Sequence, residues 1–192
     1  MMTRLLPPNL ALTFALTLGL AACGDTAARY LVEPAPTAAP VALRVSSLEV
    51  RDVVLPSYAE SSQILQEDAS GALRPVPDSE WADSSARAMT AALARSLDLQ
   101  TTAGVAAEPW PLSDAADARL DVRIDRIVAR ADQTFRMSGQ YAVASFDGAV
   151  REVLERFDIT VPMSGVTPAA IAAAKGRAID QLSEQIIARL AR

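Results

Sequence analysis

The chain has 192 residues, with 18 basic and 23 acidic side chains, one cysteine and no histidine. This length suits one compact domain or two small ones, and an apolar fraction of 51% can supply a core. Because histidine is absent, the chain has neither an imidazole base nor a histidine metal ligand. A net charge of −5 without a basic run argues against nucleic acid as a partner.

The first 22 residues have the pattern of an export signal. Arg4 precedes an apolar run over residues 10–20, which is too short to span a bilayer. The run ends in Leu20-Ala21-Ala22-Cys23, which resembles the lipobox of a bacterial lipoprotein precursor. We therefore predict that residues 1–22 are a signal peptide and that Cys23 receives a covalent lipid anchor, the alternative being an unmodified buried cysteine.

The residues after Cys23 bear on which membrane holds the anchor. By resemblance to the enterobacterial sorting rule, an aspartate directly after the cysteine retains a lipoprotein in the inner membrane. Here Gly24 takes that position and Asp25 follows it. We therefore expect the periplasmic face of the outer membrane.

Beyond the anchor, residues 23–40 are expected to form a proline-rich linker and residues 41–192 a single domain. Alternating apolar residues predict β-structure within 41–54, around 63–65 and at 72–76, with a hairpin turn at Ser70-Gly71.

A helix is predicted to follow these strands. Asp78-Ser79 offers an N-cap, and apolar residues recur at helical spacing, so we expect an amphipathic helix over about 79–98. The segment 100–118 is polar, carries Trp110 between two prolines, and is interpreted mostly as a loop.

The second half repeats the order of strands and then a helix. Strands are expected at about 120–127, 136–145 and 153–161, separated by turns at Asp132-Gln133 and Asp147-Gly148. Thr167-Pro168 then opens a second amphipathic helix over about 168–191. The predicted fold is α+β, with these two helices on a mixed, largely antiparallel sheet.

Catalytic motifs are missing from the sequence. A Ser-His-Asp triad needs histidine, and the only lysine, Lys175, has no serine three residues before it. Asp121 and Asp125 share a strand face with Arg123 between them, which favours a solvated or interface-facing surface over an acid/base pair. We predict a protein that is not an enzyme and that holds no metal or cofactor.

Three aromatic residues are candidates for a partner interface: Tyr58, Trp81 and Trp110. Trp81 invites a ligand-binding interpretation, although its spacing with Ala82 and Met89 favours packing against the core. Trp110 is either an anchor for a partner or a side chain folded back onto its own domain.

Several segments, in order, resemble the ABC-type transport auxiliary lipoproteins, the PqiC/YmbA-like group. After the lipobox come Arg29-Tyr30-Leu31, similar to a short N-terminal strand of the family placed at 29–32, and Leu55-Pro56-Ser57-Tyr58 followed by Gln63-Ile64-Leu65. Glu80-Trp81-Ala82 is similar to the start of the family's first helix, with Glu80 where the family usually has arginine.

This resemblance implies a non-enzymatic periplasmic lipoprotein that supports envelope integrity. Its expected partners are an MCE-domain protein and an ABC permease with its ATPase, which together move lipid between membranes, and a homo-oligomer is left open. The alternative is a lipid-binding or assembly lipoprotein that carries acyl chains in its own pocket.

Overall fold

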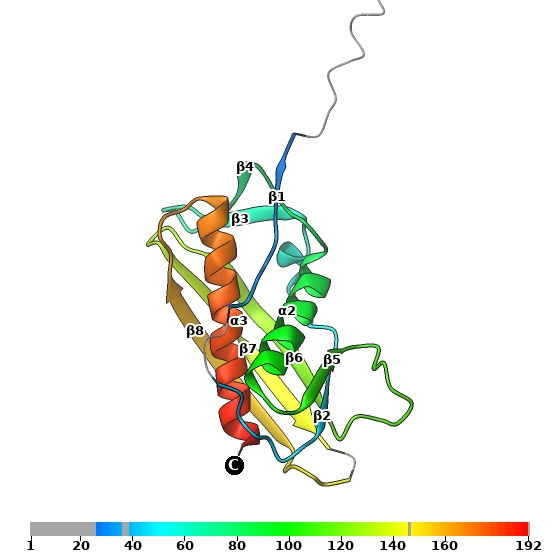
Figure 1. Ribbon diagram of the computed structural model, residues 1–192. Coiled ribbons are helices and arrows are strands. Elements are labelled where there is room, and N and C mark those ends of the chain that lie inside the picture. Colours follow the sequence, from blue (N-terminus) through cyan, green and yellow to red (C-terminus); the bar gives the residue numbers. More distant parts are fainter. Residues whose placement is uncertain (1–25, 36–38, 146, 192) are drawn as a thin grey trace, which may run out of the picture.

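The computed structural model describes residues 26–35, 39–145 and 147–191, so the predicted signal peptide and Cys23 lie outside the described residues. In chain order the elements are β1 (Ala28–Tyr30), β2 (Ser47–Val50), a 3-10 turn η2 (Ser57–Ala59), β3 (Gln63–Glu67), β4 (Leu73–Trp81), α2 (Ser85–Gln100), β5 (Gly104–Ala107), β6 (Ala118–Ala129), β7 (Thr134–Ala144), β8 (Val153–Pro162) and α3 (Pro168–Leu190). Figure 1 shows both helices in front of one large sheet.

The eight strands form one open, mixed sheet with β6 at its centre. β7 pairs antiparallel along one edge of β6, whereas β2 and β3 share the other edge and run parallel to it. The sheet continues through the antiparallel pair β7–β8 on one side. On the other side, β5 extends β2, and β4 and β1 extend β3. The prediction of an α+β fold with a mixed sheet and two helices is confirmed.

The core lies between the helices and the sheet because one face of the central strands β6, β7 and β8 is apolar. Leu120, Val122 and Ile124 of β6 are buried, whereas the alternating Asp121 and Arg123 are exposed. The apolar stripe of α3 packs against the buried face of the sheet. The opposite face of β6 is polar and exposed, as predicted for residues 121–125, and the exposed face of β8 is polar apart from Leu154 and Pro162.

The first helix begins later than predicted. Residues 79–81 belong to β4, and α2 begins at Ser85 after Ser84 as its N-cap. The predicted cap at Asp78-Ser79 was wrong because Ser79 and Glu80 pair with neighbouring strands. Ser79 lies opposite Ala28 of β1, and Gln63 of β3 lies opposite Glu80, so sheet pairing overrides the local helix signal.

Two further boundaries differ from the prediction. Residues 104–107, expected to be loop, form the edge strand β5, which pairs in parallel with β2. The region 41–54 contains one short strand, β2, and isolated bridges at Val41 and Val54. The last helix is confirmed almost to the residue: Thr167 accepts a hydrogen bond from the Ala170 amide, and Pro168 opens the helix.

Candidate functional site

Two of the three predicted interface residues, Tyr58 and Trp81, line one cavity. It has a volume of about 40 Å³ and lies between η2, β3, β4, β6 and α3. Its walls are apolar or aromatic apart from a few polar groups: Tyr58, Ala59, Gln63, Leu65, Trp81, Ile127, Val128, Ala129, Phe135, Ile171 and Lys175. We call it the aromatic cavity.

Tyr58 is held in place by the backbone of β6. Its hydroxyl accepts a hydrogen bond from the Ile127 amide at 2.9 Å and lies 3.3 Å from the Ile127 carbonyl oxygen, to which it donates. Pro56, in an extended conformation, starts the 3-10 turn that presents the ring, and its carbonyl accepts from the Ala59 amide. The hydroxyl of Tyr58 is therefore already paired, and the residue lines the cavity.

Trp81 and Lys175 form the second wall of the cavity. The Lys175 Nζ lies 4.2 Å from the centroid of the Trp81 ring, a cation–π distance. Lys175 is only 3% exposed, and within the described residues its ammonium has no hydrogen-bond or ion-pair partner. Burial lowers the pKa of Lys175 from 10.5 to about 8, because an apolar environment disfavours the charged form.

The segment that leads from the predicted anchor covers the same region. Residues 28–35, which we call the N-terminal strap, run along β4 and then across α3 (Figure 1). A side chain at Gly176 would place its Cβ 2.6 Å from the Glu33 carbonyl oxygen, so only glycine allows this approach. The crossing is fixed by Asp180, which accepts from the Ala35 amide at 3.0 Å and from the Ser96 hydroxyl at 2.7 Å.

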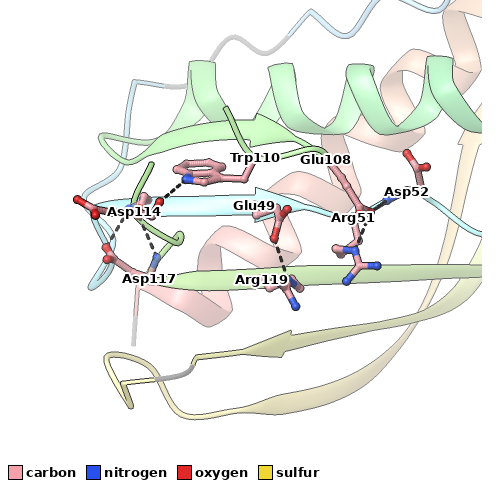
Figure 2. Close-up of polar contacts among 9 residues, drawn as sticks. Glu49, Arg51, Asp52, Glu108, Trp110, Asp114, Asp117 and Arg119 are labelled. Carbon is pink, nitrogen blue, oxygen red and sulfur yellow. Dashed lines mark hydrogen bonds and ion pairs between the residues drawn. The ribbon is translucent and has the colours of Figure 1, made fainter. Parts of the chain in front are cut away.

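Trp110 does not line the aromatic cavity and lies in the loop between β5 and β6. Figure 2 shows its indole nitrogen, which donates to the Asp114 carbonyl oxygen at 2.8 Å within the same loop. Its ring is half-buried, so the side chain folds back onto its own loop.

Charged side chains tie this loop to the sheet. Glu108 accepts from the Arg51 Nε at 2.6 Å, and this hydrogen bond lowers the pKa of Glu108 (Figure 2). Asp117 accepts from the amides of Ser46 and Ser47, which aligns β2 beside β6. These contacts hold the Trp110 loop against the sheet.

The sequence analysis did not single out Lys175 as a candidate site residue, although the side chain lines the aromatic cavity. The signal for its burial was its position in the apolar stripe of the last helix, four residues after Ile171 and three before Ala178. The contact between Lys175 and Trp81 depends on how β4 packs against α3, and the spacing of residues in the sequence does not reveal that packing.

The part of the chain that the structure describes contains no group of three or more acidic or cysteine side chains placed to hold a metal. Across the same residues, neither helix is long and apolar enough to cross a bilayer.

A family model for the ABC-type transport auxiliary lipoprotein component matches residues 30–187. The chain belongs to this family. The match begins at Tyr30, the last residue of β1, and ends near the end of α3, so it covers most of the strap, strands β2 to β8 and nearly all of both helices. It includes Tyr58, Trp81, Trp110 and Lys175.

Solved structures share the fold of this auxiliary lipoprotein. A crystal structure described as an uncharacterized protein is 15% identical, covers 85% of this chain and 97% of its own, and has a TM-score of 0.69. Protein XCC0632 from Xanthomonas campestris is 17% identical, covers 84% of this chain and 90% of its own, and has a TM-score of 0.60. No curated protein matches the chain.

Proposed function

We propose that this auxiliary lipoprotein is a non-enzymatic, periplasmic subunit of an MCE/ABC-type lipid transport system, anchored in the outer membrane through Cys23. The observation that carries the proposal is the family match over residues 30–187, joined to the lipobox at residues 20–23. In this role the domain holds the outer-membrane end of an assembly whose other members are an MCE-domain protein, a permease and an ATPase.

The position of β1 supports a domain held close to the membrane. Four residues lie between Cys23 and Ala28, the start of β1, so five residue-to-residue steps join the two. Because an extended chain spans at most about 3.6 Å per residue, the lipidated residue and β1 lie within about 18 Å of one another. The strap is fixed to β4 and α3, so the anchor restrains the whole domain and not a free tail.

The outer edge of β8 offers a place for a partner. β8 is ten residues long, and within the described chain it pairs only with β7. An unpaired strand edge can take up a further strand from another chain, through backbone hydrogen bonds. Of its exposed charged side chains, Asp158 is already paired with Arg136 of β7, whereas Arg156 is exposed, so a strand with an acidic residue near Arg156 fits this edge.

Affinity purification of the acylated protein from cross-linked envelopes of its own host tests the proposal. We expect to recover an MCE-domain protein together with a permease and its ATPase. The Cys23→Ser variant should fold, lose the anchor and fail to support envelope integrity. A soluble Cys23→Ser protein with full activity, or recovery of the acylated protein without any such partner, contradicts the proposal.

A Gly24→Asp variant serves as the matched control for location. It keeps Cys23 and its lipid, but under the enterobacterial sorting rule it is retained in the inner membrane of an enterobacterial host. If the outer membrane is the site of action, this variant loses function although it is acylated.

A further inference from the structure

Lys175 leaves an uncompensated positive charge inside the protein. The side chain is 3% exposed, and its ammonium meets the Trp81 ring but no acceptor or carboxylate among the described residues. An isolated buried charge is unfavourable, and a cation–π contact offsets only part of that cost. An anion placed beside Lys175 would offset the remainder.

There is space for such an anion next to the ammonium. The aromatic cavity of about 40 Å³ is lined by Lys175 and Trp81 and exceeds the volume that one water molecule needs, about 15 Å³. Lys175 is the only cationic side chain in its wall. A single positive charge in a small apolar cavity matches a monoanion, whereas phosphate would need more donors.

A larger hollow lies beneath the strap, next to a narrow cavity that Lys175 and Trp81 line; neither residue lines the larger hollow itself. Lys175 and Trp81 line a narrow cavity of about 10 Å³ that shares part of its lining with a trough of about 330 Å³. The trough lies between the strap and α2, and its wall is largely apolar: Leu31, Val32, Pro34, Ala88, Ala91 and Ala92, with Glu33, Asp83 and Arg95. Its size falls within the range of small-ligand sites.

The other titratable groups around Lys175 do not satisfy its charge. Tyr58 is paired with the backbone of Ile127, and Asp83 forms an ion pair with Arg87 at 4.0 Å. Tyr30 of β1 is the remaining titratable residue that lines the narrow cavity together with Asp83 and Lys175. With a pKa of about 8, the Lys175 amine is still largely protonated at neutral pH and can pair with a carboxylate.

We propose that Lys175 binds the carboxylate of a single-chain organic acid, and that the trough between the strap and α2 takes up the acyl chain when that acid is a fatty acid. This site goes beyond the transport role. Its test measures binding alone, so it can fail while the transport role stands.

Because Lys175 is the only lysine, one labelled side chain reports the site. The acylated full-length protein, with lysine labelled by ¹³C at Cε, is titrated in non-ionic detergent with acetate, octanoate and inorganic phosphate. We expect a saturable shift of the Lys175 signal with both carboxylates and a rise of its pKa toward the ordinary value. Octanoate should bind more tightly than acetate, because only octanoate reaches the trough.

Two substitutions test the carboxylate-binding part and the acyl-binding part of the site separately. In a Trp110→Phe background, Trp81 is the only tryptophan, and its fluorescence follows binding without a lysine label. Lys175→Met should weaken both carboxylates by about tenfold or more, since a charged hydrogen bond is lost. Ala91→Asp, at an exposed position in the trough, should weaken octanoate and leave acetate unchanged.

The outcomes decide the proposal. Binding of acetate without a gain for octanoate supports the carboxylate site and identifies short organic acids as its ligands. An unshifted Lys175 signal with both acids, an equal shift with phosphate, or equal binding by Lys175→Met overturns the proposal. The titration of the unaltered chain does not depend on whether any variant folds.

Discussion

Gly139 in β7 is the position where we expect the smallest substitution to do most damage to the sheet. It lies opposite Ile124 of β6, where a register shift interrupts the ladder before Arg126. A Cβ at Gly139 would overlap the Arg123 carbonyl oxygen and lie 3.0 Å from the Ile124 Cα. These are backbone atoms, so a rotamer change cannot relieve the clash and the two strands must separate.

The expected cost of Gly139→Ala follows from this geometry. Overpacking a filled core costs about 1–3 kcal/mol, and each ladder hydrogen bond that opens adds about 1 kcal/mol. We therefore expect a loss of about 3 kcal/mol in the free energy of unfolding. For a domain of this size, such a loss lowers Tm by roughly 6–12 °C.

Gly104→Ala in β5 is the matched control. The nearest atom to a Cβ there is the Ser46 carbonyl oxygen at 3.8 Å, an ordinary contact, so this variant should lie within about 0.5 kcal/mol of the wild type or be slightly more stable. Thermal unfolding followed by far-UV circular dichroism measures both. The reasoning is refuted if Gly139→Ala unfolds at the same temperature as Gly104→Ala.

Two further substitutions test α3. The unfolded chain binds more protons than the folded chain between pH 8 and 10.5, because burial lowers the pKa of Lys175 to about 8. This lysine therefore makes stability rise with pH across that window, by about 3 kcal/mol in total, and Lys175→Met should remove the rise. Urea unfolding of both proteins at several pH values measures it, and a constant difference between them contradicts it. Thr167→Ala removes the side chain that accepts from the Ala170 amide and should cost about 1 kcal/mol in the same assay, whereas unchanged stability would show that the cap is dispensable.

Sequence reasoning located α3 because all of its signals are local. The cap at Thr167, the proline after it and the apolar period agree with the helix that forms. At residues 79–81 the local signals point the other way, since Asp78-Ser79 looks like a helix cap. The strands β1 and β3 flank this segment, and pairing with both outweighs the cap. No local sequence pattern indicates which distant strands a segment will pair with.

β5 and the aromatic cavity could not be predicted from local sequence for the same reason. The sequence Gly-Val-Ala-Ala at 104–107 is too short and small to predict a strand, and it becomes one by pairing with β2. The sequence analysis named Tyr58 and Trp81 as separate candidates for a partner interface. That they share a wall with Lys175 depends on the crossing of η2, β4 and α3, which only the structure reveals.

Gly176 links the strap to the buried lysine beside it. A glycine inside a helix costs about 1 kcal/mol relative to alanine, and here it lets the Glu33 carbonyl oxygen approach α3 closely. The residues just before Glu33 line the narrow cavity together with Lys175, so the strap covers the ammonium. The strap is also the segment that continues toward Cys23. Displacing the strap would therefore uncover Lys175, and the same segment leads toward the predicted anchor at Cys23.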